Sequence, residues 1–84
     1  MPRTDPVEAI IADALDAASI SYVGENDIAN AARLDFFLPH HGLYIECKRM
    51  ASDRSSDQLS RADNVILIQG IAAARWLATM IGNW

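Results

Sequence analysis

The segment from Arg33 to Lys48 reads RLDFFLPHHGLYIECK, and its pattern decides the fold. Two runs rich in β-formers, 33–38 and 43–48, flank Pro39-His40-His41-Gly42, which predicts a β-hairpin with a four-residue connection. That loop length sets which residues face each other across the hairpin. The expected pairs are Leu38 with Leu43, Phe36 with Ile45, and Asp35 with Glu46.

The two faces of this hairpin differ in character, because side chains alternate across a strand. One face is wholly apolar and is expected to be core. It comprises Leu34, Phe36, Leu38, Leu43, Ile45 and Cys47. The other face comprises Arg33, Asp35, Phe37, Tyr44, Glu46 and Lys48.

The flanking segments predict the remaining elements. Asp5-Pro6 suits the cap and first residue of a helix. Its apolar face consists of Val7, Ile10, Ile11, Ala14, Leu15 and Ala18. A strand is expected at Ile20–Val23 and an irregular connection at 24–32. Downstream we expect a short helix from Ser55 or Ser56 to about Ala62, a strand at 65–68 buried on both faces, and a helix at Ile71–Ile81.

The order helix, three strands, helix, strand, helix predicts an α/β domain that occupies residues 1–84. A right-handed crossover through the short helix makes the third and fourth strands parallel. The expected architecture is a mixed four-stranded sheet flanked by helices on both faces.

Size and composition limit the alternatives. The chain has 84 residues, 51% of them hydrophobic, which allows one small core or a core shared between copies. No apolar run approaches the roughly 20 residues that span a bilayer, and residues 1–5 do not resemble a signal peptide. The single cysteine excludes an intramolecular disulfide and favours an intracellular, cytoplasmic location, in a host cell if the protein is viral.

The formal net charge of −4 argues against a protein that coats DNA, since phosphate neutralisation dominates such binding. It argues less against an enzyme whose carboxylates are covered by cations. The basic residues that we expect near phosphates are Arg33, Arg49, Arg54 and Arg61.

Asp35 and Glu46 carry the chemistry of the hairpin. Directly opposed, their Cβ atoms would lie roughly 5 Å apart, where two like charges repel. A divalent cation between them removes that repulsion. Lys48 follows Glu46 by two residues, where an ammonium group can orient a water or stabilise charge on a phosphate.

Asp35 followed by Glu46-Cys47-Lys48 resembles the D…(D/E)xK motif of the PD-(D/E)xK nuclease superfamily, and the expected order of elements is similar to its αβββαβ core. The resemblance implies a restriction-endonuclease-like fold and Mg²⁺- or Mn²⁺-dependent hydrolysis of DNA. It implies metal ligands at Asp35, Glu46 and the Cys47 carbonyl, with Lys48 as the catalytic lysine.

The same resemblance assigns two further residues. Glu8 matches a glutamate on the first helix that supports the metal, and Gln58 matches a catalytic glutamine on the helix after the motif. Small members of the superfamily include virus-type replication-repair nucleases and Holliday junction resolvase-like proteins. The expected activity is that of an endonuclease on structured, viral or repair DNA. So small a chain also favours a homodimer.

Other interpretations stay open. A second hypothesis is a catalytically silent relative that binds nucleic acid or protein, and a third is a small subunit whose charged strand face is simply hydrated. Glu8 also suits a first helical turn through the dipole alone. His40 and His41 are expected to be exposed turn residues. Cys47 is expected in the core, and Trp76, Met80 and Trp84 in the core or a subunit interface.

Overall fold

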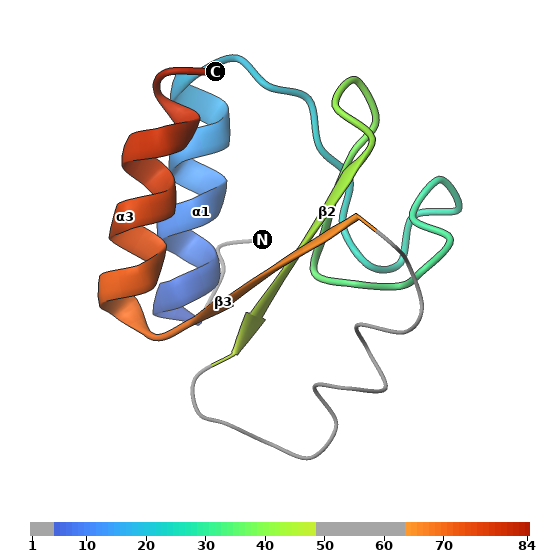
Figure 1. Ribbon diagram of the computed structural model, residues 1–84. Helices are drawn as coiled ribbons and strands as arrows, with labels where there is room; N and C mark the ends of the chain where they lie inside the picture. Colours follow the sequence, from blue (N-terminus) through green and yellow to red (C-terminus); the bar gives the residue numbers. More distant parts are fainter. Residues whose placement is uncertain (1–4, 49–63) are drawn as a thin grey trace.

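A computed structural model describes residues 5–48 and 64–84, and within them two helices lie on one side of a three-stranded sheet (Figure 1). The elements are α1 (Pro6–Ala17), β1 (Phe36–Leu38), β2 (Leu43–Lys48), β3 (Val65–Gln69) and α3 (Ile71–Ile81). The strand order is β1-β2-β3, with β1 antiparallel and β3 parallel to β2. The sheet is therefore mixed, and the predicted α/β class is confirmed.

The hairpin register is the one predicted. Phe36 pairs with Ile45 and Leu38 with Leu43. The four-residue connection closes on Leu38, whose carbonyl accepts hydrogen bonds from the backbone N–H of His41 (3.1 Å) and of Gly42 (2.8 Å). Gly42 has a φ of +62°, a left-handed conformation that glycine adopts without steric cost.

Helix α1 begins as the sequence predicts. The side chain of Asp5 accepts hydrogen bonds from the backbone N–H groups of Val7 (2.8 Å) and Glu8 (3.2 Å), and Pro6 opens the first turn. This cap satisfies two of the donors that a helix start leaves open.

The core lies between the two helices and one face of the sheet. It is formed by Val7, Ile11, Ala12, Leu15, Phe36, Leu38, Ile45, Ile68, Ala74, Leu77 and Ile81. Helices α1 and α3 pack against each other as well as on the sheet (Figure 1). None of the described helices is long and apolar enough to cross a membrane.

Three expectations about the sheet need correction. Ile20–Val23 does not form a strand; only Val23 pairs, in a single antiparallel bridge to Phe37 with reciprocal hydrogen bonds of 2.9 and 3.0 Å. The described sheet therefore has three strands, because the short β1 offers little length to a further neighbour. Strand β3 is also less buried than predicted: of Val65, Ile66, Leu67 and Ile68, only Ile68 is fully buried, since β3 ends the described sheet.

The helices do not flank the described sheet on both faces. Both α1 and α3 cover the same face. The helix expected at 55–62 lies outside the described residues.

Asn30 organises the irregular connection between Val23 and β1. It is 1% exposed. Its side-chain amide donates to the carbonyls of Gly24 (3.1 Å) and Leu34 (2.7 Å), and its Oδ1 accepts from the N–H of Leu34 (3.2 Å). The two ends of the connection are thereby joined through one buried side chain.

Replacing Asn30 by alanine is expected to destabilise the protein by about 2–4 kcal/mol, because backbone groups of the buried Leu34 and the half-buried Gly24 lose their partner. Urea unfolding at neutral pH measures the change. Asn26→Ala is the matched control: Asn26 lies in the same connection but is exposed, so the expected change is below about 0.5 kcal/mol. Equal effects of the two substitutions would contradict the role given to Asn30.

Candidate active site

Two hydrogen bonds join Asp35 to the segment Glu46-Cys47, next to the β1–β2 pair. The backbone N–H of Asp35 donates to Oε1 of Glu46 (3.1 Å). In the other direction, the backbone N–H of Cys47 donates to Oδ2 of Asp35 (2.7 Å). The predicted juxtaposition of the two acids therefore exists, and each carboxylate is oriented by the backbone of the opposite chain segment.

This arrangement differs in one respect from two carboxylates that simply face each other. Each acid has one oxygen engaged with a peptide N–H, which limits the rotation of the carboxylate. Glu46 is 3% exposed, whereas Asp35 is half-buried. The pair consists of an interior acid and an acid that reaches the surface.

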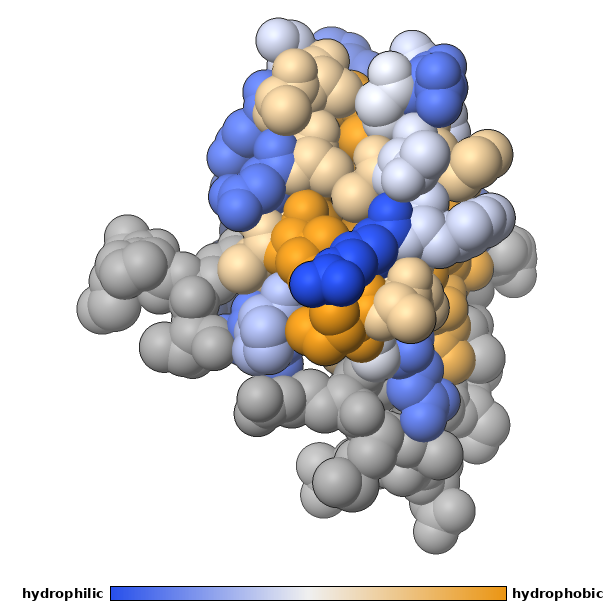
Figure 2. All heavy atoms as spheres, turned by 90° about the vertical axis from the view of Figure 1, so that its left-hand side faces the viewer, coloured by the Kyte–Doolittle hydropathy of each residue, from blue (hydrophilic) through white to orange (hydrophobic). Residues whose placement is uncertain are grey.

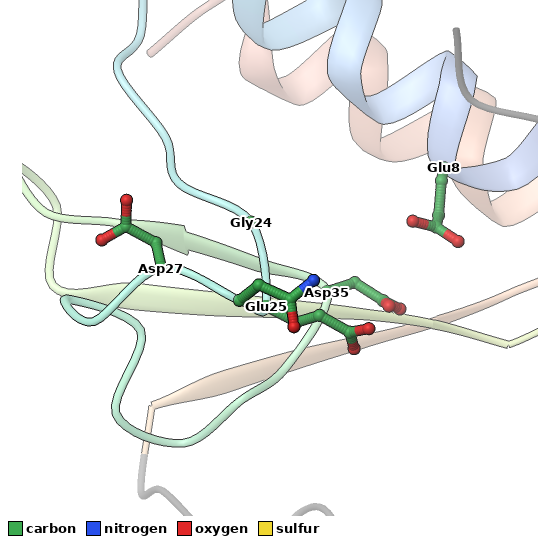
Figure 3. A pocket seen from close by; sticks show the side chains of 6 residues that line it. Glu8, Gly24, Glu25, Asp27 and Asp35 are labelled. Carbon is green, nitrogen blue, oxygen red and sulfur yellow. The ribbon is translucent and has the colours of Figure 1, made fainter. Parts of the chain in front are cut away.

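Asp35 opens onto a hollow of about 590 Å³ between the start of α1 and the connection after Val23 (Figure 3). Four carboxylates line it, together with Gly24 and Asn26. They belong to Glu8, Glu25, Asp27 and Asp35. Among the residues that the structure describes, no lysine or arginine lines the hollow, so its four carboxylates give it a negative potential that attracts cations and repels phosphate.

Glu8 reaches toward this hollow from the first turn of α1, on the side opposite Asp35 and Glu25 (Figure 3). The Asp5 cap fixes the backbone N–H of Glu8, so the helix start that the cap defines also sets where Glu8 lies. The sequence analysis assigns Glu8 and Asp35 to one site, and both side chains line the same hollow.

Cys47 lies between these acids and the core. Its side chain is half-buried and packs against the core cluster. Burial raises the pKa of the Cys47 thiol strongly, and the nearby carboxylates of Asp35, Glu8, Asp5 and Glu46 raise it further. The thiol is therefore neutral at physiological pH, and a packing role suits it better than a nucleophilic one.

The other predicted site residues divide into three groups. Lys48 is the last residue of β2, where it pairs with Gln69 of β3. Arg33 is exposed in a left-handed conformation (φ 56°), and its guanidinium donates to the carbonyl of Glu25 (3.4 Å). Four candidates lie outside the described residues: Arg49, Arg54, Gln58 and Arg61.

The histidines of the hairpin connection are exposed, as predicted. The His41 ring lies against Trp84, with ring centroids 5.7 Å apart. Neither histidine lines the acidic hollow.

Sequence reasoning missed Glu25, Asn26 and Asp27, which form one wall of the hollow. They lie in an irregular segment whose path depends on the side-chain hydrogen bonds of the buried Asn30. No periodic pattern in the sequence predicts that path. The only local signal is the turn-forming composition of Gly24 to Asn30.

Within residues 5–48 and 64–84, no three acidic, histidine or cysteine side chains converge closely enough to hold a metal ion by themselves. In comparisons with known proteins, the chain matches no family model, no curated protein and no solved structure.

The raised pKa of Cys47 predicts how stability depends on pH. The unfolded thiol ionises near pH 8.5, whereas the folded thiol keeps its proton, so the free energy of unfolding falls as pH rises above about 8.5. The contribution of this group has a slope of at most about 1.4 kcal/mol per pH unit. Below about pH 8 the thiol is protonated in the folded and the unfolded protein, so its ionisation then takes away no stability.

Urea unfolding of the parent and of Cys47→Ala, at intervals from pH 7 to about pH 10, isolates this contribution. The parent is expected to lose stability faster than the variant above pH 8.5. Parallel curves would show that the folded thiol ionises normally.

Proposed function

We propose that this protein is a Mg²⁺- or Mn²⁺-dependent nuclease that hydrolyses DNA phosphodiester bonds as an endonuclease on structured, viral or repair DNA. The observation that supports the proposal is the pair of hydrogen bonds between Asp35 and the segment Glu46-Cys47, which holds two carboxylates on neighbouring chain segments. A third carboxylate, Glu8, lines the same hollow as Asp35.

The donor chemistry fits a hard divalent cation. Carboxylate oxygens and a backbone carbonyl suit Mg²⁺ and Mn²⁺, and the described lining of the hollow contains no histidine or cysteine, the softer ligands typical of zinc. Mg²⁺ in phosphate-handling sites takes one or two carboxylates and completes its shell with waters and substrate oxygens. Asp35, Glu46 and the Cys47 carbonyl would hold the ion, with Glu8 in support.

Bound there, a divalent cation would neutralise charge on the phosphate and lower the pKa of a water. The protein itself orients the two carboxylates. Peptide N–H groups hold Asp35 and Glu46 before any ligand arrives, so little reorganisation accompanies binding. We assign Lys48 to positioning the attacking water and Gln58 to assisting it, with Arg33, Arg49, Arg54 and Arg61 contacting phosphates.

The proposal includes the finer fold assignment, a restriction-endonuclease-like core in which the single Val23 bridge takes the place of the strand expected at Ile20–Val23. Two described features support it. An antiparallel hairpin is followed by a parallel strand and a helix, and the Val23 bridge occupies the outer edge of β1. The hairpin presents the two acids at the base of its strands.

The purified protein is expected to cut DNA with Mn²⁺ or Mg²⁺ and not with EDTA, because the acidic hollow repels phosphate until a cation covers it. Lys48→Ala and Glu46→Gln should each lower the cleavage rate at least about 100-fold. A panel of plasmid, linear, single-stranded and four-way-junction DNA measures the activity and ranks the substrates.

Asp13→Asn provides the matched control for Glu46→Gln, since it also neutralises one carboxylate, on the exposed side of α1, and should leave cleavage unchanged. Circular dichroism of each variant separates loss of chemistry from loss of fold. Cleavage that survives in both Lys48→Ala and Glu46→Gln would refute the assignment of the site.

Glu8 allows a test of the metal site that needs no DNA. If Glu8 supports the cation, Glu8→Gln should weaken Mn²⁺ binding about 10-fold or more, by titration calorimetry. An acid that serves only the helix dipole would change stability by about 0.3–1 kcal/mol and leave Mn²⁺ affinity unchanged. Asp16→Asn on the exposed side of α1 is the control.

A second candidate function is supported by one observation. Both acids already accept peptide hydrogen bonds and Glu46 is almost fully buried, which a purely structural pair would also show. The protein would then be a catalytically silent relative that binds nucleic acid or protein. In that case Mn²⁺ neither binds nor raises the melting temperature, and Asp35→Asn lowers stability without changing any metal response.

A further inference from the structure

The two helices present an outward surface that a small isolated domain would not be expected to expose. On α3, Ile71, Trp76 and Met80 are 36%, 61% and 41% exposed. Figure 2 looks onto this side of the molecule and shows hydrophobic residues gathered at its centre, with hydrophilic residues lying across and around them. We call the outward surfaces of α1 and α3 the helix-pair face.

The charges on this face are segregated by helix. Arg75 is the one charged residue in the sequence of α3, and it is exposed. Helix α1 contributes Asp13 and Asp16, which are also exposed. In the described part of the chain, none of these three side chains has an ion-pair partner.

We propose that the helix-pair face binds a second copy of this chain in a two-fold dimer. Arg75 of each copy meets Asp13 and Asp16 of the other, with the exposed Trp76 next to Arg75 on the outward side of α3. In a two-fold dimer the same surface serves both subunits, so it must be complementary to itself. A face with a cation on one helix and acids on its neighbour meets that condition, because rotation places each charge opposite its counterpart.

A different partner protein explains the pattern less well. Such a partner would need a surface with an apolar side chain and charges of both signs that match the helix-pair face. A second copy of this chain already has such a surface. The composition supports the same conclusion: a short chain with a high apolar fraction gains stability by burying apolar surface between copies.

The size of the face predicts a weak dimer. At 1.5 Å per residue, helices of 12 and 11 residues are about 17–18 Å long, and packed helix axes lie roughly 8–10 Å apart. That footprint falls short of the roughly 800 Å² per subunit that stable interfaces bury. We therefore expect a dissociation constant in the micromolar range or weaker.

Sedimentation velocity of the full chain, from roughly 1 μM to 1 mM, measures the association. The parent is expected to pass from monomer to dimer within this range. Arg75→Asp, and separately the pair Asp13→Arg with Asp16→Arg, should each raise the dissociation constant at least about 10-fold, because attraction becomes repulsion at two symmetric places. Trp76→Ala should also weaken the dimer.

Combining the charge reversals tests the two-fold geometry. One chain that carries all three reversals regains complementarity and should dimerise like the parent. An equimolar mixture of the Arg75→Asp chain and the Asp13→Arg, Asp16→Arg chain should form a mixed dimer that neither forms alone. Ile28→Ser, which replaces an apolar residue that is 96% exposed in the connection before β1, should change nothing.

Circular dichroism and thermal melts establish that each variant is folded. A parent that stays monomeric at the highest concentration overturns the proposal and leaves the face to another protein. A dimer that is insensitive to both Arg75→Asp and Trp76→Ala also overturns it, as does a folded triple reversal that fails to recover dimerisation. None of these readouts depends on nuclease activity, so the dimer and the proposed chemistry fail or stand separately.

Discussion

The exchange of hydrogen bonds between Asp35 and the segment Glu46-Cys47 is the interaction on which the rest of the arrangement depends. It continues the β1–β2 pairing by one residue, with side-chain oxygens in place of the backbone carbonyls that a regular ladder would use. Since one carboxylate is anchored to each segment, a shift in register would remove both bonds and turn the apolar residues of β1 away from the core. The candidate site and the sheet register are therefore specified by the same atoms.

The hairpin could be predicted because two independent features of the sequence agree. The four-residue connection and the alternation of apolar residues each demand that Phe36 pair with Ile45, and they leave no second register that buries the same face. The first residues of α1 and α3 were also predictable, those of α1 from the Asp5-Pro6 cap and those of α3 from the break at Gly70. In these places local chemistry and tertiary packing favour the same structure.

The segment before the hairpin behaves differently. Ile20–Val23 has the composition of a strand, yet strand formation needs a partner with unpaired backbone groups, and the short β1 accepts only Val23. The wall of the hollow at Glu25 to Asp27 was unpredictable for a related reason. Its position follows from three hydrogen bonds of one buried asparagine, and no sequence window shows that Asn30 is buried. Acids on the hairpin could thus be predicted, whereas the loop that faces them could not.

The connectivity of the sheet also has a consequence for the order of folding. The β1–β2 pair closes through four residues, whereas sixteen residues separate β2 from its parallel neighbour β3. Closing the longer loop costs more entropy, and parallel pairing brings no reward until the intervening chain is in place. Hairpins form within about 1–10 μs, so loop-closure entropy favours the meeting of Asp35 and Glu46 before the long-range contacts. The placement of the two acids therefore depends on one short loop closure, whereas the docking of β3 and α3 depends on the longer one.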